Sequence, residues 1–253
     1  MSERTIVEIC AGSLESALDA GRGGADRIEL CDDLAAGGVT PSAGAIAVAC
    51  GTLRVPVHVL VRPRAGDFLP SEDEFQAMRH DVAAAGALGA SGVVLGLLRP
   101  DGTIDRERTA RLIELARPMS VTFHKAFDEV PDPFEALETL IELGVNRVLT
   151  SGGRPTAREG AGALRRLVES ARGRIAILAG GRIAEADVET LLETAGVREI
   201  HLGSAVARTV ETAMRHVPPN GLDPCRAGID PEKVRAILGR VARWDRRRSG
   251  SDA

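Results

Sequence analysis

From residue 5 to about residue 204 the chain repeats one unit: a short β-branched run, a small or polar turn, and a helical stretch rich in Ala, Leu and Glu. Successive β-type runs are separated by one helix-length segment, so the strands should be parallel neighbours. The predicted strands cover residues 6–10, 27–31, 55–62, 92–96, 120–124, 147–151, 174–179 and 199–203. Eight such units in 253 residues predict a single (β/α)8 TIM-type barrel. A doubly wound open sheet with an appendage is the competing arrangement.

No Pro/Ser/Gly-rich linker divides the chain, so we expect one domain over residues 1–245. Residues 205–230 are less regular and predict a long loop between the eighth strand and a last helix at about 231–243. Such a loop would start at the barrel mouth and could cover it. The basic run that follows, Arg246–Arg248 and then Ser-Gly-Ser, predicts a disordered polar tail over 246–253.

Arg208 and Arg226 fall within that loop and could add positive charge at the mouth. Several helix starts are clear from capping residues. Ser71 and Glu74 form a capping box, and the pairs Asp132-Pro133 and Asp230-Pro231 place an N-cap before a proline.

Strand alternation places polar residues on one face of the predicted strands and aliphatic residues on the other. In a barrel the aliphatic face packs against the helices, so the polar face should look into the interior. Those polar residues are Glu8, Glu29, His58, Arg62, Thr122, His124 and His201. Because they come from five strands, the pattern predicts a site near the C-terminal ends of the strands. The alternative is an ion network that satisfies itself and only fills the barrel.

The first two strands share a Glu-x-Cys pattern. Glu8 and Cys10 lie on one face of the first strand, and Glu29 and Cys31 on one face of the second. A carboxylate and a thiol should therefore repeat side by side on neighbouring strands. Thiolates are ligands of soft metal ions, so Cys10 and Cys31 form a candidate metal site. They could equally be small buried hydrophobic residues.

The turns after the strands favour anion binding, because free backbone N–H groups at helix starts attract negative charge. Arg62 and Arg64 leave the third strand and could hold a carboxylate or phosphate. The candidate turn residues are Ser151, Gly152, Gly153, Gly180, Gly181, Gly203 and Ser204. They suggest a second hypothesis, an enzyme acting on a small anionic or phosphorylated metabolite.

In that enzyme, Glu8 or Glu29 would be the general base, and His124 or His201 an acid or base. The two hypotheses use different residues. Metal binding employs the cysteines and leaves the histidines, glutamates and arginines without a task, whereas the enzyme does the reverse.

Composition excludes several classes of function. The formal charge of −4 and the pI near 5.8 argue against a nucleic-acid or membrane surface held by charge. No apolar run is long enough to cross a bilayer, and the N-terminus has no secretory pattern. The four cysteines are dispersed, without a C-x-x-C pair, so no disulfide framework is suggested. We therefore expect a cytoplasmic protein.

Several segments together resemble the CutC family, whose members are named copper homeostasis proteins. The matching stretches are Glu8–Cys10, Gly24–Cys31, Gly37–Ser42, Arg62–Phe68, Val121–Asp128 and Arg147–Gly152. The resemblance covers nearly the whole chain. It implies a TIM-type barrel, a cytoplasmic location and a homo-oligomer, either a dimer or a tetramer. It also implies copper(I) binding through two cysteines, which fall on Cys10 and Cys31.

Overall fold

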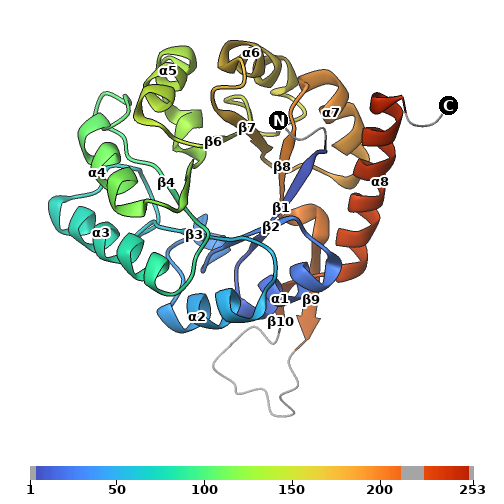
Figure 1. Ribbon diagram of the computed structural model, residues 1–253, viewed down its shortest axis with the longest axis horizontal. Coiled ribbons are helices and arrows are strands. Elements are labelled where there is room, and N and C mark those ends of the chain that lie inside the picture. Colours follow the sequence, from blue (N-terminus) through green and yellow to red (C-terminus); the bar gives the residue numbers. More distant parts are fainter. Residues whose placement is uncertain (1–3, 212–224, 251–253) are drawn as a thin grey trace.

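The protein is a closed barrel of eight parallel strands surrounded by helices (Figure 1). The structure is a computed structural model that describes residues 4–211 and 225–250. The strands are β1 (Ile6–Ala11), β2 (Arg27–Leu30), β3 (Val57–Leu60), β4 (Gly92–Leu95), β5 (Ser120–Phe123), β6 (Arg147–Thr150), β7 (Ala176–Gly180) and β8 (Glu199–Leu202). Because β8 pairs with β1, the sheet has no open edge. The TIM-type prediction is confirmed, and the open-sheet alternative is wrong.

Each crossover between barrel strands contains a helix on the outside of the sheet (Figure 1). The helices are α1 (Leu14–Gly23), α2 (Ala43–Thr52), α3 (Glu72–Ala87), α4 (Arg106–Ala116), α5 (Pro133–Leu143), α6 (Ala161–Ala171), α7 (Val188–Ala195) and α8 (Pro231–Ser249). The predicted caps are confirmed: Ser71 and Glu74 cap α3 reciprocally, and Asp132 and Asp230 accept backbone N–H bonds at the starts of α5 and α8.

The main core lies between the strands and the helices. Its strand side is built from the aliphatic positions that the alternation predicts to face outward, such as Val7 and Ile9 on β1 and Val121 and Phe123 on β5. These four side chains are at most 2% exposed. With one face of every strand packed in this way, the other face must fill the barrel interior.

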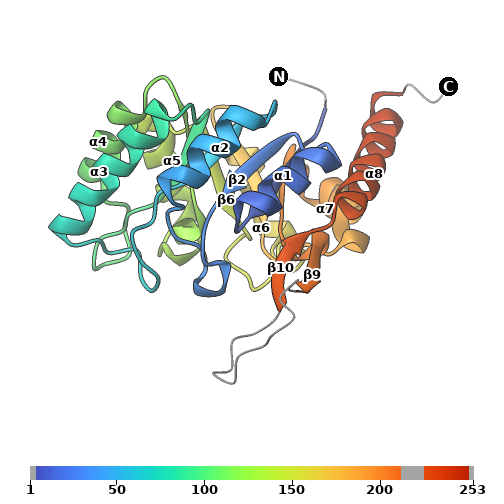
Figure 2. The same ribbon diagram turned by 90° about the horizontal axis from the view of Figure 1, so that it is seen from below.

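The segment after β8 differs from the prediction of an irregular loop. Its described parts form an antiparallel hairpin of β9 (Ala207–Glu211) and β10 (Cys225–Ile229). The hairpin lies beside α1 at the lower side of Figure 2. Arg208 donates to Asp19 at 2.8 Å, and Arg226 pairs with Glu15, so both arginines bind α1 rather than the barrel mouth. Residues 212–224, including Pro218–Gly221, lie outside the described residues.

The last helix does not end at about residue 243 as predicted, and it includes residues 246–249 of the predicted disordered tail. Helix α8 continues through Ser249 and ends at Gly250, which adopts a left-handed conformation. Arg247 pairs with Glu189 at 2.5 Å, and the Arg248 guanidinium lies 5.5 Å from the centre of the Trp244 ring. Basic side chains in the last turn also interact favourably with the helix dipole. Residues 251–253 lie outside the described residues.

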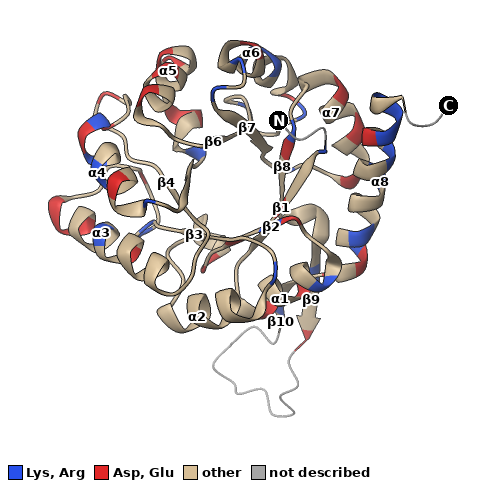
Figure 3. Ribbon diagram, in the orientation of Figure 1, with Lys and Arg blue, Asp and Glu red and all other residues tan. Residues whose placement is uncertain are grey.

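Charged residues of both signs are spread around the ring of helices, except on α2, which carries none (Figure 3). No described helix is long and apolar enough to cross a membrane.

Glycines on neighbouring strands make room for interior histidine rings. A Cβ atom at Gly92 would lie 2.6 Å from the ring of His58, and one at Gly96 would collide with the ring of His124. A Cβ at Gly180 would lie 3.1 Å from the Cβ of His201. The positions of these histidines therefore depend on glycine at the facing strand positions.

We expect Gly92→Ala to lower the free energy of unfolding by about 1–3 kcal/mol, because the buried His58 ring would have to move. The matched control is Gly51→Ala in α2, where no heavy atom outside its own helix lies within 4 Å of the new Cβ. That change should raise stability by about 0.5–1 kcal/mol, because alanine favours the helix. Urea unfolding measures both. Equal stabilities of Gly92→Ala and wild type would contradict the close packing.

Candidate functional site

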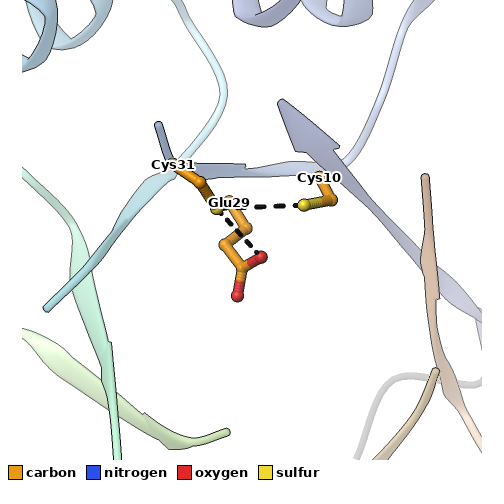
Figure 4. A group of neighbouring side chains, drawn as sticks. All are labelled: Cys10, Glu29 and Cys31. Atoms are coloured by element: carbon orange, nitrogen blue, oxygen red, sulfur yellow. Dashed lines mark hydrogen bonds between the residues drawn. The ribbon is translucent and has the colours of Figure 1, made fainter. Parts of the chain in front are cut away.

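Two cysteine sulfurs meet inside the barrel near its C-terminal end (Figure 4). Cys10 lies on β1 and Cys31 directly follows β2, and their Sγ atoms are 3.8 Å apart. The Cys31 thiol donates to Glu29 Oε2 at 3.3 Å. Cys10 is 9% exposed and Cys31 2%. The parallel register pairs Cys10 with Glu29, so the repeated Glu-x-Cys pattern places both sulfurs on one side of the same carboxylate.

A second group of side chains shares Glu29 with the sulfurs. His201 on β8 places Nδ1 2.7 Å from Glu8 Oε1 and Nε2 3.7 Å from Glu29 Oε2. The ligand atoms of Cys10, Glu29 and Cys31 all lie within 4.8 Å of one another, and so do those of Glu8, Glu29 and His201. The structure thus brings together both predicted glutamates, both predicted cysteines and one of the predicted histidines.

On the N-terminal side of this group, charged side chains of alternating sign form a series of ion pairs along the barrel interior. Arg27 pairs with Glu8 and, at 2.5 Å, with Glu199. Glu199 also accepts from Arg147 Nε at 3.1 Å, and Arg147 donates to Ser120 at 2.8 Å. This part of the interior is the self-satisfying network that the sequence left open as an alternative.

Sequence reasoning missed Arg27, Arg147 and Glu199 as members of the interior. The signal was available, because Arg27 has the same strand parity as Glu29, and Glu199 the same parity as His201. These residues lie at the starts of their strands, away from the mouth where site residues were sought.

The charge chain sets the protonation of the site. Burial raises the pKa of Glu8, but the charge of Arg27 and the hydrogen bond with His201 outweigh it and hold that pKa well below its usual range. Burial also lowers the pKa of His201, but Glu29, Cys10 and Glu8 outweigh it and raise that pKa well above 6.5. Burial and the Cys10 sulfur raise the pKa of Glu29 to about 8.

The pKa values of the two thiols are shifted in opposite directions. Their mutual hydrogen bond lowers the pKa of Cys10 well below its usual value and raises that of Cys31 well above it. The first proton therefore leaves the pair much more readily than the second. The arrangement favours a thiolate at Cys10 facing a thiol at Cys31.

His58 and His124 are buried and neutral, and neither belongs to the two groups of side chains around Glu29. Burial lowers the pKa of each to about 3. His124 is the N-cap of the short helix η2 (Lys125–Glu129), where its Nδ1 accepts from the Ala126 N–H at 3.2 Å. Its ring packs on Phe68 with 4.8 Å between ring centres. The predicted acid–base residues thus divide into Glu8, Glu29 and His201 in one cluster and His124 in another.

The arginines predicted to bind anions differ in their surroundings. Arg64 donates to Glu74 at 2.7 Å and to Asp67 at 2.8 Å. Its guanidinium is therefore paired with one carboxylate of its own loop and one of the following helix, α3. Arg62 is buried and donates to the carbonyls of Gly38 and Gly66 at 2.8 and 2.7 Å.

The turn after β6 binds an anion that belongs to the protein. The Asp128 carboxylate accepts from the hydroxyls of Thr150 at 2.5 Å and of Ser151 at 3.0 Å. It also accepts from the backbone N–H groups of Ser151 at 3.0 Å and of Gly153 at 2.9 Å. Asp128 thus occupies the turn at Ser151, Gly152 and Gly153, and an external anion would have to displace it; anion binding at this turn stays a prediction.

The remaining glycine turns border the site. A Cβ at Gly203 would lie 3.8 Å from the Cβ of Cys10, and Gly180 adjoins His201. The carbonyl of Gly181 accepts from Ala157 N at 2.9 Å, and Ser204 begins the short helix η4 (Ser204–Val206). Anion binding at Gly180, Gly181, Gly203 and Ser204 stays a prediction.

A family model described as the CutC family matches residues 5–206. The chain belongs to the CutC family. A human relative named copper homeostasis protein cutC homolog is 47% identical over 203 residues, covering 80% of this chain and 74% of the relative. A CutC family protein of Chromobacterium violaceum is 48% identical over 225 residues, covering 89% of this chain and 90% of that protein.

Solved structures agree with the fold of this CutC family member. The crystal structure of the CutC protein from Streptococcus agalactiae superposes with a TM-score of 0.75 at 32% identity, covering 79% of this chain and 98% of that one. The phosphoribosylanthranilate isomerase of Pyrococcus furiosus, with a TM-score of 0.58 and 13% identity, covers 95% of this chain and 100% of its own. The isomerase shares the barrel fold alone.

The neutral state of His124 predicts a pH dependence of stability. Its pKa is about 3 in the folded protein and 6.5 when unperturbed, so the unfolded chain binds the extra proton between these values. Stability should therefore fall as the pH drops below about 6.5, by up to about 1.4 kcal/mol per pH unit. In His124→Asn the amide oxygen still caps η2 but cannot titrate, so the slope between pH 6 and 4 should be shallower by about one proton.

Urea unfolding at a series of pH values measures this slope. His80→Asn, at an exposed position on α3, is the control for the replacement of a histidine by asparagine. An unchanged slope in His124→Asn would show that His124 is not held neutral.

Proposed function

We propose that this CutC family protein binds Cu(I) in the barrel mouth through Cys10 and Cys31. The observation that supports this proposal best is the 3.8 Å distance between the two Sγ atoms. Metal–thiolate bonds are about 2.3 Å long in zinc sites, so one soft ion at a similar distance would reach both sulfurs without strand movement. Sulfur ligands favour Cu(I) over hard cations, which prefer oxygen.

The surroundings of the sulfurs fit a cation. Thiols must lose protons to bind a metal, and the hydrogen bond between the pair already favours a thiolate at Cys10. Glu29 accepts from the Cys31 thiol at 3.3 Å, so an oxygen atom lies beside the proton that this thiol must lose. The imidazole of His201 and the carboxylate of Glu29 are the further groups within reach of an ion at this position.

The family name, copper homeostasis, is consistent with copper as cargo rather than as a resident cofactor. A pair of free thiols persists in a reducing compartment, so we place the protein in the cytoplasm. The homo-oligomer that the resemblance implies belongs to the same proposal, and light scattering in solution tests it.

The direct test is titration of reduced protein with Cu(I) in competition with a chelator of known affinity. The double variant Cys10→Ser, Cys31→Ser should bind Cu(I) more weakly by about 100-fold or more, since even the loss of groups around the ligands costs about 10- to 100-fold. Serine is nearly the same size but supplies no soft ligand, so the barrel should stay folded.

The matched control removes the two other cysteines, Cys50 and Cys225, which are only partly buried and lie outside the site. The variant Cys50→Ser, Cys225→Ser should keep the wild-type affinity. Equal Cu(I) affinities for the Cys10/Cys31 variant and wild type would end the proposal.

A further inference from the structure

Arg62 is a buried cation that forms no ion pair among the described residues, and the charge of Asp67 acts on it only from beyond ion-pair distance. Arg62 lies in the turn just after β3, and the residue is 9% exposed. Within residues 4–211 and 225–250, no carboxylate lies within ion-pair distance of its guanidinium. The neighbouring Arg64, in contrast, has two carboxylate partners. Buried charges in proteins are normally paired, so an anion bound beside Arg62 would offset the cost of burying its charge.

The hydrogen bonds of Arg62 fix its orientation and leave its Nε atom without an acceptor in the described part of the chain. Its Nη atoms donate to the carbonyls of Ala36, Gly38 and Gly66, at 3.3, 2.8 and 2.7 Å. Carbonyl oxygens satisfy these donors but do not neutralise the charge. The Nε–H group is buried and has no acceptor among the described residues.

His124 provides a second fixed donor close to Arg62. Because Nδ1 accepts from Ala126, the proton of the neutral ring is on Nε2, which can only donate. Phe68 links the two residues: its ring centre is 5.1 Å from the guanidinium carbon of Arg62 and 4.8 Å from the ring centre of His124. The charge of Arg62 is also one cause of the low pKa of His124, as expected for close neighbours.

We propose that Arg62 and His124 form an oxyanion subsite between the exits of β3 and β5, for the carboxylate or phosphate group of a small metabolite. Arg62 supplies the charge and His124 a neutral N–H donor. The subsite adjoins the sulfur pair, because Arg62 holds the carbonyl of Gly38, and a Cβ at Gly38 would lie 3.9 Å from the Sγ of Cys31. It does not rest on copper binding, and neither cysteine takes part in it.

The experiment is calorimetric titration of the full-length protein with inorganic phosphate and, separately, with acetate, at pH 7 and constant ionic strength. Wild type should bind at least one of them saturably, and the tighter of the two identifies the preferred group. Arg62→Gln should weaken that binding at least tenfold. His124→Asn, which keeps the η2 cap but removes the Nε2–H donor, should weaken it several-fold.

Two control variants show whether the anion binds at this subsite and not elsewhere on the barrel. Arg165→Gln removes an exposed arginine of α6 that pairs with Glu169, and it should bind the anion as wild type does. The Cys10→Ser, Cys31→Ser variant should also keep anion binding, whatever happens to its copper affinity. Failure of the copper proposal is therefore distinguishable from failure of this one.

Three results would overturn the proposal. The first is the absence of saturable binding of either anion by wild type up to about 10 mM, which corresponds to less than about 3 kcal/mol of binding free energy. The second is equal affinity in wild type and His124→Asn, a comparison that remains available if Arg62→Gln fails to fold. An anion would have to widen the cavity beside Arg62 and Phe68, whose volume of about 20 Å³ holds one water. The third result is therefore a phosphate-soaked crystal in which this cavity keeps its size and Arg62 Nε binds only a water.

Discussion

The interior of the barrel depends on one chain of buried ion pairs, from Arg147 through Glu199 and Arg27 to Glu8 and His201. Strand closure forces every second side chain inward, so these charges cannot reach bulk water and must neutralise one another. Removing one member of such a buried pair typically costs about 3–5 kcal/mol, because its partner is left uncompensated. The chain ends at His201, where the fixed charges give way to groups that can exchange protons, Glu29 and the two thiols.

That order of charges accounts for the position of the site. The ion pairs hold Glu8 ionised, Glu8 orients His201 through Nδ1, and His201 then presents Nε2 toward Glu29. The two sulfurs lie on the mouth side of this carboxylate, because the register pairs Cys10 with Glu29. Glycines at facing strand positions leave space for the histidine rings, so backbone and charge chain together fix the geometry.

Local pattern predicted the barrel, its strands and the inward face, because alternation and helix caps are properties of short segments. The same alternation placed Glu8, Glu29, Cys10 and Cys31 together from the sequence alone. It did not show that Asp128 fills the turn at Ser151–Gly153, since Asp128 lies on η2, outside the strands whose alternation fixes the direction of a side chain. The alternation of side chains also gave no sign that Arg247 and Arg208 pair with carboxylates on helices that are distant in the sequence.

The central claim is that the two inward cysteines bind one soft ion as a pair. X-ray absorption at the copper edge on Cu(I)-loaded protein tests it most directly, because sulfur neighbours differ from nitrogen and oxygen neighbours in distance and scattering. The account predicts sulfur scatterers in wild type that disappear in the Cys10→Ser, Cys31→Ser variant. A copper environment of nitrogen and oxygen alone, or identical spectra for the two proteins, would contradict it.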